Sequence, residues 1–263
     1  MDKFKLLTTR RSVRTFDGQP LSAEDVQNIR EYIENIPNPY GIPVKFVYMD
    51  AKEMGLSSPV ITGEAAYIAG IVEKVPHREE AFGFSFERMV MHLWSRGIGT
   101  TWIAGTFKRE FFEKAAGIKE NEVMYCVTPV GYPAKKKSIK EVAMRKGVGA
   151  DKRKDGAELF FEGDFTKPLA AADEGLKQAL EAVRWAPSAV NKQPWRIVKN
   201  GNEFHFYLKH DKNYATADGG DLQKVDMGIA LCHFIDMTGG SLNVADPGIE
   251  TPEGIEYIAS VTV

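Results

Sequence analysis

Cysteine, long apolar runs and an excess of one charge are scarce in this sequence. Cys126 and Cys232 are the two cysteines and lie in no CxxC pair, which excludes a disulfide framework and a cysteine zinc site. No apolar run approaches the ~20 residues that a membrane-spanning helix needs. Lys plus Arg (34) nearly balance Asp plus Glu (36), which argues against nucleic-acid binding. The N-terminal sequence MDKFKLLTTRRS lacks the apolar core of a signal peptide, so we expect a soluble, cytoplasmic protein.

The 263 residues are long enough for one large domain or two small ones, and they contain a repeat. Residues 20–47 and 168–198 share the order Pro-Leu, helix, Pro, loop, Pro, strand, at an offset of about 148 to 150 residues. Two apolar helices, FSFERMVMHLW and VDMGIALCHF, follow at an offset near 140. The repeat predicts two copies of one α+β unit, and we place the boundary between residues 1–155 and 156–263.

Local patterns predict the elements of each copy. In the first copy these are a helix capped by Ser22 and Asp25 and ended by Pro37, strands 43–50 and 65–72, a helix at 84–94, a strand at 100–104, a helix capped by Thr106 and closed by Gly117, and a central strand within 123–133. In the second copy they are a helix at 176–185, a hairpin at Asn200-Gly201, a helix at 222–237 and a C-terminal strand.

Three stretches carry candidate chemistry. In an extended chain Arg10, Ser12 and Arg14 point the same way and offer donors to a phosphate or polyol, although a solvated basic N-terminus is the alternative. The loop 186–195 offers Ser188 and other polar groups to the edge of a planar heterocycle, whereas its counterpart at 36–47 has few of them. The Gly-rich turn 97–105 could let backbone approach a ligand, but this signal is weak. The basic stretch 135–154 is by composition a solvated linker.

The motifs RRSVRTF, APSAVNKQPWRIV, RGIGTTWIAG and PVGYP together resemble the FMN-dependent nitroreductase family, over most of residues 8–240. The motif RRS lies in the first copy and PSAVN in the second, which resembles members with an internally duplicated domain. The resemblance implies tandem α+β units with mainly antiparallel sheets flanked by helices, arranged as a fused pseudo-dimer. It also implies one FMN per chain, with NAD(P)H as co-substrate.

The resemblance assigns cofactor-binding roles residue by residue. Arg10 and Ser12 would hold the phosphate and ribityl chain, with Arg11 beside them, and Arg14 would lie near the N1–C2=O edge of the flavin. The backbone of Ile103, Ala104 and Gly105 would approach N5. The remaining cofactor-binding residues are Lys152, Arg153 and Lys154 on the phosphate, Pro187, Ser188, Ala189 and Asn191 along the flavin, and Gln193 supporting that loop. The histidines show no metal-ligand spacing, so no metal is expected. Because the resemblance implies that flavin N5 does the chemistry, no catalytic side chain is expected, with Arg14 as a candidate stabiliser of the reduced flavin's charge.

These roles predict an NAD(P)H oxidoreductase that passes hydride through flavin N5 to a nitroaromatic or quinone by a ping-pong mechanism. A small-molecule acceptor is the expected partner, and the chain is expected to be a monomeric pseudo-dimer for which further dimerisation is not excluded. Three alternatives stay open: flavin cleavage or reductive dehalogenation on the same fold, a non-enzymatic FMN carrier, and a structural protein without cofactor.

Overall fold

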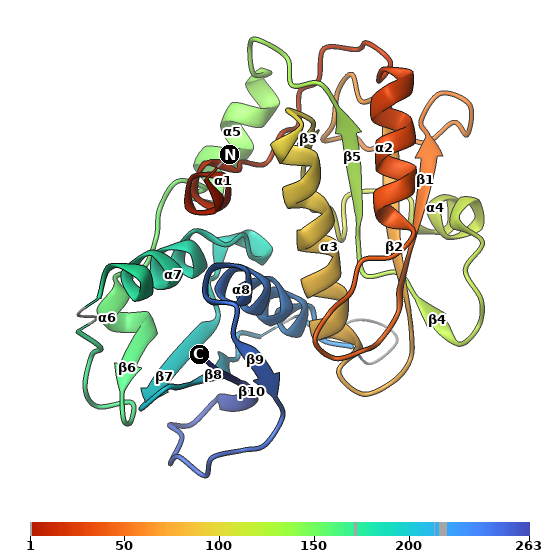
Figure 1. Cartoon of the computed structure of the whole chain (residues 1–263). Helices are drawn as coiled ribbons and strands as arrows, with labels where there is room; N and C mark the ends of the chain where they lie inside the picture. The colour runs from red at the N-terminus through yellow and green to blue at the C-terminus, as the bar shows by residue number, and fades with distance from the viewer. Residues whose placement is uncertain (1, 171–172, 213, 216–219) are drawn as a thin grey trace. The chain divides into compact units, whose positions relative to one another are not determined.

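The chain forms two compact units in a computed structural model that describes residues 2–170, 173–212, 214–215 and 220–263 (Figure 1). The first unit comprises Thr9–Arg78 and Ser85–Ala150. The second unit comprises the described residues of Met1–Thr8, Glu79–Phe84 and Asp151–Val263. Residues 171 and 172, which fall in the second copy of the sequence repeat, lie outside the described residues.

The first unit is built on an antiparallel sheet of five strands in the order β1-β2-β5-β3, with β4 also paired to β2. Its strands are β1 (Val44–Asp50), β2 (Ala66–Glu73), β3 (Gly99–Thr100), β4 (Glu122–Val123) and β5 (Val127–Gly131). Its helices are α2 (Ala23–Ile33), α4 (Arg109–Ala116), α5 (Ile139–Gly147) and most of α3 (Arg78–Ser95). Strands β2 and β5 are buried along nearly their whole length, as two-sided apolar strands should be.

The second unit has a five-stranded sheet in the order β6-β7-β8-β10-β9, in which the pair β6–β7 is parallel and the others are antiparallel. Helices α7 and α8 pack on each other and lie over one face of this sheet (Figure 1). The strands are β6 (Phe160–Glu162), β7 (Trp195–Asn200), β8 (Glu203–Lys209), β9 (Ser241–Asn243) and β10 (Ile255–Thr262). The helices are α1 (Lys3–Thr9), α6 (Gly156–Leu159), α7 (Glu174–Trp185), α8 (Leu222–Thr238) and the short 3₁₀ helix η1 (Ala189–Asn191).

The two sheets repeat one topology. In each unit a helix precedes a pair of antiparallel strands, and a long apolar helix follows that pair. Two later strands then extend the sheet, the second of them (β5 or β10) beside the pair and the first (β3 or β9) at the edge, so the order β1-β2-β5-β3 matches β7-β8-β10-β9. Strand β6 is an addition beside β7. The prediction of two tandem α+β units with mainly antiparallel sheets is therefore confirmed.

Within the second unit the first turns of α3 cross α8 at two glycines. A Cβ added to Gly83 would lie 2.0 Å from the carbonyl oxygen of Val225, and one added to Gly228 would lie 2.1 Å from that of Glu80. Each obstructing residue precedes the glycine of its own helix by three positions, so the crossing is symmetric. It brings together Gly83 and Gly228, which lie 145 residues apart in the sequence.

Several local predictions need correction. The two-residue turn of the β7–β8 hairpin is Gly201-Asn202 rather than Asn200-Gly201, because Asn200 pairs with Glu203. Helix α4 begins after Lys108 without a side-chain cap, so Thr106 is not its cap, although Gly117 closes it as expected with φ 65°. The predicted strand 100–104 is confined to β3 and one bridge at Ile103.

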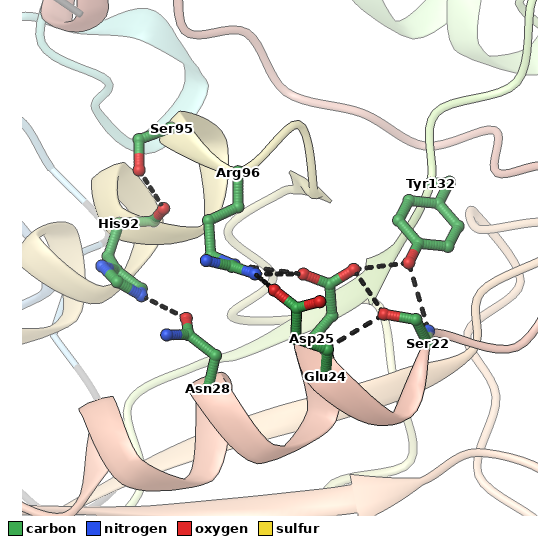
Figure 2. A network of polar contacts seen from close by, with 8 residues as sticks. All are labelled: Ser22, Glu24, Asp25, Asn28, His92, Ser95, Arg96 and Tyr132. Carbon is green, nitrogen blue, oxygen red and sulfur yellow. Dashed lines mark hydrogen bonds and ion pairs between the residues drawn. The ribbon is translucent and has the colours of Figure 1, made fainter.

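A polar network fastens the start of α2 to the end of α3 and to the residue after β5 in the first unit (Figure 2). Arg96 Nη2 donates to Asp25 Oδ1 at 2.9 Å, and Tyr132 Oη donates to Asp25 Oδ2 at 2.5 Å. The predicted capping box is modified: Ser22 caps the amide of Asp25, but its own amide donates to Tyr132 Oη at 3.1 Å. Burial alone would raise the pKa of the Asp25 carboxyl, yet the three hydrogen bonds outweigh it and lower that pKa.

Tyr132→Phe is expected to lower the free energy of unfolding by about 1–3 kcal/mol at pH 7, because an ionised carboxylate loses a donor. A carboxyl whose folded pKa is depressed stabilises the fold above its unfolded pKa and loses that effect as the pH falls through the folded pKa. The difference between wild type and variant should therefore shrink below about pH 4. Urea unfolding at several pH values measures it. In an Asp25→Asn background the tyrosine substitution should cost clearly less, and an equal cost in both backgrounds would contradict the role of the carboxylate.

Candidate functional site

The RRS motif lies beside β3 in the first unit. Val13 N–H donates to the carbonyl of Thr100 at 2.8 Å, and Ser12 forms a parallel bridge with the same residue. This approach requires Gly99, since a Cβ there would lie 2.9 Å from the Val13 Cβ. The glycine-rich turn 97–105 was a weak prediction of close backbone approach to a ligand. At Gly99 it instead allows the close approach of the RRS segment.

Arg10 is buried, so this segment is not a solvated basic terminus. Its side chain is 4% exposed and its Nε lies 3.7 Å from Oε1 of the fully buried Glu87. Trp102 Nε1 donates to the other oxygen of that carboxylate at 3.0 Å. Within the described part of the chain, Nε and Nη1 of Arg10 have no hydrogen-bond acceptor. Burial lowers the pKa of the Arg10 guanidinium and Glu87 opposes that shift. Unmatched buried donors of this kind suit an anionic acceptor.

A second buried carboxylate and a third guanidinium complete this cluster. Arg14 donates its backbone N–H to Oε2 of the buried Glu141 at 3.2 Å. Burial lowers the pKa of the Arg14 guanidinium, Glu141 opposes it, and the charges of Arg145 and Arg10 lower it further. Three cations thus face two carboxylates, which leaves a positive excess that favours anions.

Arg145 was missed at the sequence level, because its basic stretch was interpreted as a linker. Residues 139–147 instead form helix α5, whose cap Ser138 accepts from Glu141 N–H at 3.2 Å. Ser138 also accepts a hydrogen bond from the Thr15 hydroxyl at 3.0 Å, which fixes the helix to the RRS segment. Arg11, the neighbour of Arg10, is exposed.

The segment 103–105 lies in the same unit. Ile103 exchanges both backbone hydrogen bonds with Val127 at 3.0 Å, so its amide is not available to a ligand. Arg109 Nη2 donates to the carbonyl of Ala104 at 3.0 Å and holds the segment in place. Among the described residues, the amides of Ala104 and Gly105 have no acceptor. No motif or spacing in the sequence points to this role of Arg109.

The PSAVN loop is strained. Val190, Asn191 and Gln193 have φ of 51°, 56° and 51°, the left-handed region that costs a residue with a side chain of order 1–3 kcal/mol. Ser188 Oγ accepts from Gln193 N–H at 2.8 Å across the loop. Ala189 N–H donates to both oxygens of Asp226 at 3.0 and 3.1 Å. Such conformations persist only where the surroundings hold them, and they cluster at functional sites.

The loop is joined to the basic tripeptide 152–154 within the second unit. Asn191 Nδ2 donates to the carbonyl of Lys152 at 3.0 Å, and Lys154 N–H donates to Gln193 Oε1 at 2.9 Å. The guanidinium of Arg153 lies 4.4 Å from the centre of the Trp185 ring. Burial lowers the pKa of the Lys154 amine. The candidate residues therefore fall into two clusters: Arg10–Arg14 with Ile103–Gly105 in the first unit, and Lys152–Lys154 with Pro187–Gln193 in the second.

Neither a metal centre nor a membrane span is found in the part of the chain that the structure describes. No group of three or more His, Cys, Asp or Glu side chains there could hold a metal ion, and no described helix is long and apolar enough to cross a membrane. His92 stacks on Tyr32 at 3.6 Å and contacts Asn28 (Figure 2), while His233 Nδ1 lies 2.8 Å from the carbonyl of Ala182. Both histidines contact residues of a neighbouring helix, α2 for His92 and α7 for His233.

Comparisons with known proteins show the family and the fold of this chain. The profile of the family described as "Putative TM nitroreductase" matches residues 2–238. The crystal structure of a putative nitroreductase from Thermotoga maritima MSB8 is 19% identical and superposes with a TM-score of 0.66, covering 100% of this chain and 94% of its own. A nitroreductase family protein from Clostridium novyi NT is 17% identical, with a TM-score of 0.44 over 51% of this chain and 87% of its own. An FMN-dependent nitroreductase from Clostridium difficile R20291 is 16% identical, with a TM-score of 0.43 over 51% of this chain and 88% of its own. No curated protein matches.

Proposed function

The chain belongs to the "Putative TM nitroreductase" family, and from this premise we propose that it is an FMN-dependent NAD(P)H oxidoreductase built from two nitroreductase-like halves, 1–155 and 156–263. The observation that carries the proposal is the buried Arg10 side chain, whose Nε and Nη1 lack an acceptor in the described chain. A phosphate dianion is the acceptor that such a guanidinium fits best.

The residues present fit FMN. Arg10 and Ser12 would hold its phosphate and ribityl chain, in a cluster whose three guanidiniums exceed two carboxylates. The backbone amides of Ala104 and Gly105 would face N5. The amide of Ile103 donates to the carbonyl of Val127, so Ile103 would contribute packing and not a hydrogen bond to the flavin. Ser188, Ala189 and Asn191 would line the same cofactor, with Lys152–Lys154 beside them. That the two clusters serve one flavin rests on the resemblance of their motifs.

When bound, FMN would supply the chemistry of hydride transfer between NAD(P)H and a nitroaromatic or quinone-like acceptor. The protein's part is electrostatic. Arg14 would supply a fixed positive charge at the N1–C2=O edge, where reduced flavin is anionic. The carboxylate of Glu141 accepts from the backbone N–H of Arg14 and so fixes the position of the Arg14 backbone. No side-chain nucleophile or metal is needed for this chemistry.

We expect one FMN per chain. The reciprocal site would need an RRS equivalent near Phe161, where the chain has Glu162 and Asp164 instead. Glu162 lies 3.8 Å from Lys199, and Asp164 accepts from the Thr166 hydroxyl at 2.6 Å. These carboxylates would repel a phosphate. The reciprocal loop keeps Asn38, but its Nδ2 already donates to the carbonyl of Ile42 at 2.7 Å.

Titrating apoprotein with FMN while following flavin fluorescence tests this. A plateau at one flavin per chain, independent of chain concentration, is the expected result, and a plateau at two would contradict it. Oxidation of NADH or NADPH in the presence of menadione or nitrofurazone then separates an enzyme from a carrier. Purified protein without flavin absorption that also fails to bind added FMN would overturn the proposed function.

A further inference from the structure

Asp226 is a buried carboxylate that the proposed function leaves without a role. It lies in the early turns of α8 and is 4% exposed. Both of its oxygens accept from Ala189 N–H, at 3.0 and 3.1 Å. Burial raises the pKa of this carboxyl well above its ordinary value, the bond from Ala189 opposes the shift, and the charge of Asp221 adds to it. Burying a carboxyl costs desolvation free energy, and the hydrogen bond to the loop is the contact that offsets this cost.

The loop that Asp226 contacts has a strained backbone with few stabilising contacts of its own. Val190, Asn191 and Gln193 all have positive φ, and Val190 is β-branched and 61% exposed, so its side chain gains little from packing. The bond between Ser188 and Gln193 lies inside the loop. The loop also accepts a hydrogen bond from the Lys154 amide and donates one to the Lys152 carbonyl, but these two residues lie in a segment without regular structure.

Helix α8 provides the rigid support that these partners lack. Residues 225 to 234 of this helix are buried without a break. Asp226 belongs to this buried stretch and accepts from the Ala189 amide, where the strained turn begins. A donor held at the start of a strained turn fixes the direction of the backbone that follows.

We propose that Asp226 is a positioning residue for cofactor binding: by holding the Ala189 amide, it keeps residues 186–194 in the conformation that receives FMN. This inference rests on the proposed function. It adds a residue that makes no contact with the flavin and acts through the loop.

Four variants of the full-length chain test the proposal. Asp226→Ala removes the acceptor, Asp226→Leu removes it while filling the volume, and Asp226→Asn keeps an acceptor oxygen of the same shape. Asp236→Ala, in the same helix and remote from the loop, is the matched control. The measurements are FMN affinity by fluorescence quenching and hydrogen–deuterium exchange of the peptide containing Ala189 in the apoprotein.

Asp226→Ala and Asp226→Leu should weaken FMN binding about tenfold or more and speed exchange at Ala189, because the Ala189 amide loses its buried acceptor. Asp226→Asn should stay within about threefold of wild type in affinity, which a merely electrostatic effect would not give, and the loss in Asp226→Leu excludes a mere volume effect. Asp236→Ala should leave both readouts unchanged. The proposal is overturned if wild type binds FMN and the Ala and Leu variants bind it equally well, or if Asn fails to rescue. A wild-type chain that binds no FMN overturns the proposed function itself.

Discussion

Gly228→Ala is expected to lower the thermal midpoint by 10 °C or more, on the order of 3 kcal/mol or more of lost stability. The added Cβ would lie 2.1 Å from the carbonyl oxygen of Glu80 and 2.9 Å from the amide nitrogen of Phe84. Both obstacles are backbone atoms of α3, so no rotamer change relieves the overlap and the helices must separate. The two helices are buried here, so separation also opens a void in the core.

Gly83→Ala should behave the same way, since its Cβ would meet the carbonyl oxygen of Val225 at 2.0 Å. Gly147→Ala is the matched control: it lies in α5 and a Cβ there meets nothing within 4 Å. Alanine at this position should leave stability unchanged or raise it by about 0.5–1 kcal/mol. Circular dichroism melts of the three variants decide the matter. A midpoint for Gly228→Ala within 2 °C of wild type would mean that the crossing is looser than these distances require.

This crossing also shows what the sequence could and could not predict. The helices were predicted from their apolar runs, and the hairpin from Asn200-Gly201, because both signals are local. The register between α3 and α8 depends on where two backbones touch, and the glycines that allow it look like any other glycine in a helix. Thr106 is not the cap because the N-cap position of α4 is Lys108. The carbonyl of Thr106 accepts from the Ser58 hydroxyl at 2.7 Å, a partner 48 residues away that no local pattern predicts.

The candidate site divides in the same manner. Arg10, Ser12, Arg14 and the PSAVN loop stand in compact motifs, and sequence alone could single them out. Arg145, Arg109 and Asp226 act on those motifs from other elements, through bonds or charge that only the folded chain brings near. Their residue types are common on helices, so no spacing in the sequence distinguishes them. Supporting groups of this kind become visible only with the tertiary structure.

Arg10→Ala is expected to weaken FMN binding by about tenfold to a hundredfold, because the phosphate loses a charge-assisted donor worth ~1.5–3 kcal/mol. The same substitution removes the cation that lies 3.7 Å from the fully buried Glu87, and breaking a buried pair costs about 3–5 kcal/mol of stability. The two effects have different origins and can be separated. In Arg10→Ala/Glu87→Gln the uncompensated charge is gone while Trp102 keeps an acceptor oxygen, so much of the stability should return.

FMN affinity should not return in that double variant, since the phosphate still lacks its partner. Arg30→Ala, an exposed arginine of α2 whose guanidinium lies over Tyr48 at 4.8 Å, controls for the loss of one positive charge and should leave affinity unchanged. Urea unfolding and flavin fluorescence titration, run on the same preparations, give the two quantities. If affinity recovers together with stability, then Arg10 serves the fold through Glu87 alone, and its unmatched Nε and Nη1 must find another acceptor. If stability recovers and affinity does not, FMN binding depends on the Arg10 guanidinium itself and not on the stability of the buried pair, as expected for donors that the phosphate accepts from directly.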